Sequence, residues 1–106
     1  MITKPEDNTR EFRREHEIHV GNIPTPIRMR AYRRKADGML LIEQSHFIKT
    51  GIQYLPYSVN EFQSSDEEAI MCDLEKTILG FYDQAVRRGY APSESWLVPN
   101  SAFDDK

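Results

Sequence analysis

The sequence predicts an α+β domain, in which one long C-terminal helix packs on one face of an antiparallel sheet of three to five strands. Three observations favour this class. Polar and apolar side chains alternate in two runs between residues 12 and 35. The pair Asp37-Gly38 separates two strand-like runs, as in a β-hairpin. Residues 64–89 carry helix start and stop signals around an apolar stripe.

The first strand is expected in residues 12–20 and the second in residues 27–35, with the turn Gly21-Asn22 and two prolines between them. A strict alternation would place Phe12 on the same face as His16 and Ile18. A third strand follows Asp37-Gly38. A short fourth strand, residues 52–55, ends at Pro56.

A two-residue turn at Asp37-Gly38 would fix the hairpin register. It predicts Met29 opposite His46 and Tyr32 opposite Glu43. One face is then mostly apolar, and the other interleaves arginines with aromatic and aliphatic side chains. We expect this second face to remain uncovered within one chain.

The helix is expected to begin at a capping box formed by Ser65 and Glu68, and to end at Gly89. Its apolar arc covers roughly half of the helix surface, which is more than one sheet face needs. The arc predicts a second packing partner, either the C-terminal tail or another protomer. Its edge contains Cys72, for which burial is the expected state. The arc consists of Ile70, Met71, Leu74, Ile78, Phe81, Tyr82 and Ala85, extended by Cys72, Leu79 and Val86.

Size and composition indicate one domain over residues 11–99, with mobile segments at 1–10 and 100–106. With 39% hydrophobic residues in a chain of 106, the hydrophobic core must be small, and an oligomer interface would bury additional apolar surface. The single cysteine excludes an intrachain disulfide. No apolar run approaches the roughly 20 residues that span a bilayer. A cytoplasmic location follows by elimination.

Charge is unevenly distributed along the chain. Residues 1–35 contain nine Lys and Arg against five Asp and Glu, whereas residues 36–106 contain five against twelve. Either the two parts neutralise each other, within or between protomers, or the basic part binds an anionic partner.

The second strand carries the strongest candidate for binding, a row formed by Arg28, Arg30, Tyr32 and Arg34. Guanidinium groups with an aromatic ring among them can contact phosphates and stack on bases. The pI of 5.6 argues against nucleic acid, and no nucleic-acid-binding fingerprint is present. The same row could meet acids such as Glu43, Glu61 or Glu75.

Glu75 is a second binding candidate, because it lies inside the apolar arc of the helix. It must reach solvent at a rim, pair with a cation, or become protonated in a pocket. We predict an ion pair with an arginine across an interface.

Pocket candidates are His46, Tyr54, Tyr57 and Trp96, which could line a cavity between sheet and helix, although such residues are more often plain core or rim residues. Ser95–Val98 is expected to add a short strand or to lie over the helix. His16 and His19 are three residues apart and would lie on opposite faces of a strand, so we expect no metal or other cofactor.

No motif assigns a reaction. The function that the pattern favours is that of a non-catalytic interaction or regulatory protein acting as a homo-oligomer. Two alternatives stay open: a nucleic-acid-binding module that uses the arginine row, and a small-ligand or enzymatic pocket between sheet and helix.

Overall fold

The structure is a computed structural model, and it describes residues 8–103. In chain order the elements are β1 (Arg10–Ile18), β2 (Ile27–Arg34), β3 (Leu40–Gln44), β4 (His46–Ile48), β5 (Glu61–Phe62), helix α1 (Glu67–Arg87), a 3₁₀ turn η1 (Glu94–Trp96) and β6 (Leu97–Pro99).

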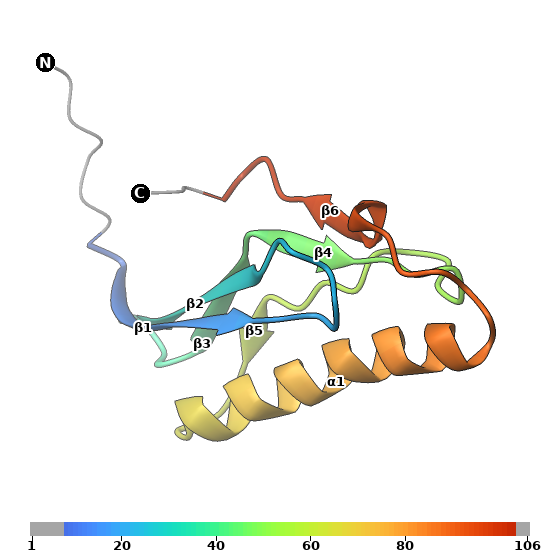
Figure 1. Ribbon diagram of the computed structural model, residues 1–106. Coiled ribbons are helices and arrows are strands. Elements are labelled where there is room, and N and C mark those ends of the chain that lie inside the picture. Colours follow the sequence, from blue (N-terminus) through green and yellow to red (C-terminus); the bar gives the residue numbers. More distant parts are fainter. Residues whose placement is uncertain (1–7, 104–106) are drawn as a thin grey trace, which may run out of the picture.

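The strands form two antiparallel sheets. The larger has the order β1-β2-β3-β5, and β4 pairs with β6 in the smaller. Figure 1 shows α1 running along one face of the larger sheet, and the β4–β6 pair lies above the helix in this view. The predicted α+β class, with an antiparallel sheet and one long helix on one of its faces, is confirmed.

The core lies between α1 and the larger sheet and continues to the smaller sheet. Its fully or almost fully buried residues come from β1 to β4, from the connection between β1 and β2, from α1, and from η1 and β6. They are Ile18, Val20, Ile23, Ile27, Met29, Ala31, Leu40, Ile42, Ile48, Met71, Leu74, Ile78, Ala85, Trp96 and Leu97. The buried helical stripe is narrower than the predicted arc. Cys72 is exposed, which corrects the expectation that it is buried, because it lies at the solvent edge of the stripe.

The predicted helix is confirmed, but its capping residue differs from the expected Ser65. Asp66 is the N-cap, and its carboxylate accepts a hydrogen bond of 3.0 Å from the backbone N–H of Ala69. At the other end Arg88 is the C-cap, and Gly89 follows with a φ of +91°. Glycine adopts this left-handed conformation without the steric cost of a Cβ, so the helix ends where the sequence predicts.

The predicted hairpin register is wrong by two residues. Met29 pairs with Gln44 instead of His46, and Tyr32 pairs with Leu41 instead of Glu43. The connection has four residues rather than two, since the N–H of Arg34 donates to the carbonyl of Met39 at 2.9 Å. A shift of two keeps every side chain on its predicted face, because side chains alternate with a period of two.

A β-bulge in β1 places Phe12 on the opposite sheet face from the one predicted. Phe12 pairs with Tyr32 and Arg14 with Ala31, so the register shifts between them. Phe12 therefore lies on the face away from α1, whereas His16 and Ile18 lie on the α1 side. The extra residue of a bulge reverses the alternation, which a strict period of two does not anticipate.

Two further strand boundaries differ from expectation. The predicted third strand is divided at Ser45 into β3 and β4, because the chain leaves the larger sheet there to pair with β6. Residues 52–55 form no strand, and β5 takes the sheet edge instead. Near the C-terminus both predicted outcomes occur together: β6 is a short strand, and Trp96 packs edge-to-face on Tyr82 of α1 with ring centroids 5.7 Å apart.

The predicted mobile ends fall mostly on residues 1–7 and 104–106, which lie outside the described residues. Of the remainder, Arg10 begins β1, and the side chain of Asn100 donates to the carbonyl of Gln44 at 2.9 Å. The Phe103 ring lies against the guanidinium of Arg30, 4.3 Å from its centroid. The sheet face away from α1 is thus partly covered within one chain, which corrects the expectation of an uncovered face. No helix among residues 8–103 combines the length and apolarity that a membrane span requires.

Candidate functional site

The predicted arginine row lies on β2 and faces away from α1. Each of its guanidinium groups has an acidic partner within the chain. Arg28 and Arg30 both reach Glu15 of β1, at 3.2 and 2.8 Å. Arg34 bridges Asp37 at 2.6 Å and Glu61 at 3.0 Å. The row is therefore a set of cross-strand ion pairs.

These pairs shift the titration of the acids. The hydrogen bond from Arg30 lowers the pKa of Glu15, although partial burial of the carboxylate acts in the opposite direction. The hydrogen bonds from Arg34 lower the pKa of Asp37 to about 2. Both acids therefore stay ionised at neutral pH, and the arginines stay paired.

Tyr32, the aromatic residue of the row, also has contact partners within the chain. The Arg10 guanidinium lies 4.0 Å from the centroid of the Tyr32 ring, and Phe12 packs against the ring edge-to-face with a centroid distance of 5.6 Å. Burial raises the pKa of the Tyr32 hydroxyl, and the charge of Glu43 adds to this effect. The ring is thus held between neighbours of its own chain.

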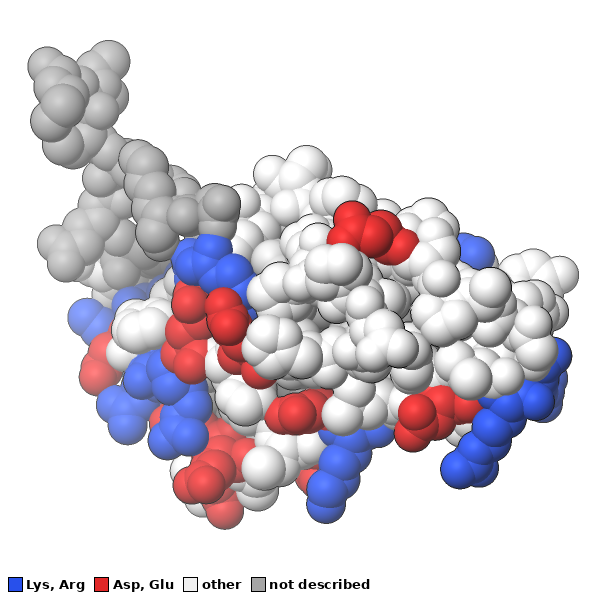
Figure 2. All heavy atoms as spheres, viewed as in Figure 1, with Lys and Arg blue, Asp and Glu red and all other residues white. Residues whose placement is uncertain are grey.

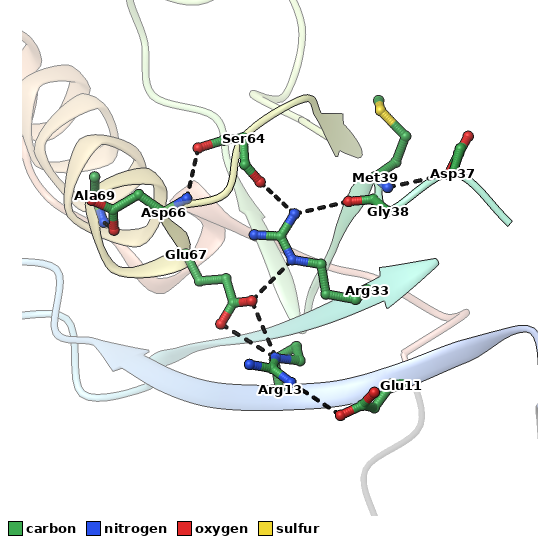
Figure 3. A network of polar contacts seen from close by, with 10 residues as sticks. All are labelled: Glu11, Arg13, Arg33, Asp37, Gly38, Met39, Ser64, Asp66, Glu67 and Ala69. Carbon is green, nitrogen blue, oxygen red and sulfur yellow. Dashed lines mark hydrogen bonds and ion pairs between the residues drawn. The ribbon is translucent and has the colours of Figure 1, made fainter. Parts of the chain in front are cut away.

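A second charge cluster, unforeseen in the sequence, forms at the start of α1 (Figure 3). Glu67 accepts from Arg13 of β1 at 3.1 Å and from Arg33 of β2 at 2.9 Å. Arg33 also donates to the backbone oxygens of Gly38 and Ser64. This Glu67 clamp, defined by Glu67, Arg13 and Arg33, ties the helix start, two strands and the hairpin turn together.

The Glu67 clamp borders an open cleft of about 560 Å³, which Gln63, Ser64 and Ser65 also line. Burial tends to raise the pKa of Glu67, but the hydrogen bond from Arg33 and the charges of both arginines lower it overall. Since the charges satisfy one another, the cluster has a structural role and offers no free group for chemistry.

Glu75 pairs with His16 of β1, with Oε1 and Nε2 2.6 Å apart. The predicted arginine partner is thus replaced by a histidine of the same chain. Both side chains are partly exposed at the rim between α1 and the β1 edge, and solvent screens such a pair. His16 lies on the α1 face of β1, as strict alternation from Ile18 predicts, and α1 brings Glu75 next to it.

Of the four pocket candidates, Tyr54 and Tyr57 line one open depression, which His46 and Trp96 do not line. His46 lies in β4, and its Nδ1 is 2.9 Å from the hydroxyl of Ser45. Trp96 is buried against Tyr82, and Tyr57 packs on Phe81 with ring centroids 5.3 Å apart. Tyr54 is 98% exposed. Within residues 8–103, no three His, Cys, Asp or Glu side chains lie close enough together to hold a metal ion.

The most exposed apolar groups gather at the loop of residues 51–58, which we call the apolar loop. Leu55 is 75% exposed beside Tyr54. Next to them, an open depression of about 370 Å³ is lined by this loop and Phe81 of α1. In Figure 2, charged side chains crowd the region of β1 to β3 and the α1 surface, while much of the remaining visible surface is uncharged.

Leu55 was not predicted as a surface residue, because residues 52–55 were expected to form a strand. A signal was present: the segment Ile52–Leu55 has only four residues, one of them Gln53, and lies between Gly51 and Pro56, a pattern that also fits a loop. Comparisons of the chain with protein-family models, with curated proteins and with solved structures found no match.

Proposed function

We propose that the protein is a non-catalytic interaction module that acts as a homodimer through the apolar loop. One observation carries this proposal: two adjacent large side chains, Tyr54 and Leu55, are 98% and 75% exposed. Single exposed apolar residues are ordinary on protein surfaces, but contiguous ones indicate an interaction surface.

A second copy of the chain fits this surface. The exposed Leu55 itself lines the depression, together with Ile52, Tyr57 and Phe81. A two-fold interface uses the same patch on both subunits, so a knob next to a hole can be self-complementary. The residues that line this depression carry no charge, so two copies would not repel each other there.

The other candidate functions have less support. Nucleic-acid binding through Arg28, Arg30, Tyr32 and Arg34 would require these groups to exchange their partners within the chain for phosphates and bases. A catalytic pocket would require His46, Trp96 and the tyrosines to converge, and they lie in different surroundings. The proposal places the dimer in the cytoplasm, in keeping with a chain that forms no intrachain disulfide.

Light scattering behind size exclusion, at micromolar concentration, tests the proposal. Wild-type protein should elute with the mass of a dimer. Leu55→Asp should elute as a monomer, because it places a charge in the apolar contact. Phe12→Asp is the matched control, since Phe12 is also an exposed large apolar residue, 55% exposed, but lies on the sheet face away from α1.

A monomeric wild-type protein would overturn the homodimer. A dimer that only Phe12→Asp dissociates would move the interface to the sheet face and refute the role of the apolar loop. Circular dichroism of both variants should match the wild type, because both substitutions lie on the surface.

A further inference from the structure

A second depression, which we call the cationic depression, involves the apolar loop and the end of α1. It has a volume of about 530 Å³ and is lined by Lys49, Gly51, Ile52, Gln53, Tyr54, Arg88 and Tyr90. Two of these residues are cations and none is an acid. The depression beside Phe81 has no charged residue in its lining, so the two differ in chemistry.

The two cations are available for a ligand. In the part of the chain that the structure describes, neither Lys49 nor Arg88 has a side-chain hydrogen bond or ion pair. By contrast, the arginines of β1 and β2 described above form ion pairs with Asp or Glu side chains. A pair of cations without an acid beside them attracts an anionic group.

Tyr90 has a fixed position in this depression. The backbone N–H of Tyr90 donates to the carbonyl of Ala85 at 3.1 Å, which closes the end of the helix. Its ring lies directly on Gly51, where a Cβ would overlap the ring atoms. The ring nevertheless remains 47% exposed. A pre-positioned tyrosine of this kind offers contact area at little entropic cost.

We propose that the cationic depression binds an acidic segment of a partner protein. Carboxylates of the segment pair with Lys49 and Arg88, and an apolar side chain beside them packs against Tyr90 and Tyr54. Charged and apolar contacts in one depression favour a polypeptide, whose side chains supply both. Single-stranded nucleic acid is less suited, because it needs a cationic groove that follows several phosphates.

The cationic depression shares Ile52, Gln53 and Tyr54 with the depression at the proposed dimer contact, but Lys49, Arg88 and Tyr90 line the cationic depression alone. The two proposals can therefore fail separately: light scattering reports on the first, and peptide binding reports on the second.

A displayed library of random dodecapeptides is the probe, selected on the full-length protein. Enriched peptides should contain Asp or Glu within a few positions of an aromatic or aliphatic residue. Fluorescence anisotropy with a synthetic enriched peptide then compares variants. The double variant Lys49→Glu with Arg88→Glu should weaken binding by ~10-fold or more, because each lost charge pair becomes a repulsion. Tyr90→Ala should weaken it by ~5-fold or more, through lost contact area.

The matched control is Lys35→Glu with Lys76→Glu, which alters net charge by the same amount at exposed positions outside the cationic depression. It should leave peptide affinity within about two-fold of wild type, since distant surface charges are screened. A library without enrichment, or enriched peptides that bind the Lys49/Arg88 variant as tightly as wild type, would refute the site. Tighter binding of a twelve-nucleotide single strand than of any peptide would assign the depression to nucleic acid instead.

Discussion

At the scale of single residues, Glu67 connects the start of α1 to two strands that lie far from it in the sequence. Its carboxylate is mostly buried, and it pairs with arginines of two different strands. It also lies in the first turn of α1, where the helix dipole favours a negative charge. Removing this charge would leave Arg33, itself largely buried, without its ionic partner.

We expect Glu67→Gln to lower the free energy of unfolding by about 1–3 kcal/mol at pH 7, as for the loss of hydrogen bonds between charged groups. The folded state lowers the pKa of Glu67, so this stabilisation is present above the pKa of the unfolded carboxyl. It disappears as the pH falls through the folded pKa. Urea unfolding of both proteins from pH 7 to pH 3 should therefore show two curves that converge at the acid end.

Glu68→Gln is the control for this measurement. Glu68 also lies in the first turn of α1, but it is exposed. Its loss removes only the interaction with the helix dipole, about 0.3–1 kcal/mol. Equal effects of the two substitutions at pH 7 would contradict a special role for the Glu67 clamp.

At the scale of secondary-structure elements, local signals predicted the helix and the second strand well. The helix ends at Asp66, Arg88 and Gly89 depend on hydrogen bonds and backbone conformations of residues that are adjacent in the sequence. The same holds for the faces of β2, which follow from alternation alone.

Features that depend on distant residues could not be predicted in this way. The hairpin register depends on whether the turn has two or four residues, and Asp37-Gly38 fits both lengths. The break at Ser45 depends on β6, which lies about fifty residues later and pairs with β4. The bulge in β1 and the partners of the arginines likewise come from tertiary packing. Glu75 was correctly identified as a residue that needs a polar partner, but the choice of His16 depends on how α1 packs beside β1.

Two glycines give opposite predictions. Gly80 lies inside α1, and a Cβ there would meet nothing within 4 Å. We expect Gly80→Ala to raise the free energy of unfolding by about 0.5–1 kcal/mol, because alanine restricts the unfolded chain and favours the helix. Gly21 has a φ of +52°, and a Cβ there would overlap the Tyr82 ring. Gly21→Ala should lower stability by at least about 1–2 kcal/mol, the cost of the left-handed conformation alone. Thermal melts of both variants check the signs.

At the scale of the whole molecule, the uneven charge along the sequence is balanced in part within one chain. Ion pairs join the basic first third to acids of the remainder: Arg10 with Glu43, Arg33 with Glu67, and Arg34 with Glu61. These ion pairs connect strands and the helix that lie far apart in the sequence. Exposed pairs among them add little stability, so the continuous apolar core must hold the two sheets and α1 together.

Trp96 provides a direct test of that continuity. It is the only tryptophan, so its fluorescence reports on one place, where the segment leading into β6 packs on Tyr82 of α1. The core includes residues of both sheets and of α1 in one cluster. If this cluster unfolds as a unit, the Trp96 fluorescence and the far-UV circular dichroism should give the same urea midpoint and slope, as for a small two-state domain. An earlier fluorescence transition would mean that the β4–β6 sheet detaches before the larger sheet and helix unfold, and the core would then consist of two independent parts.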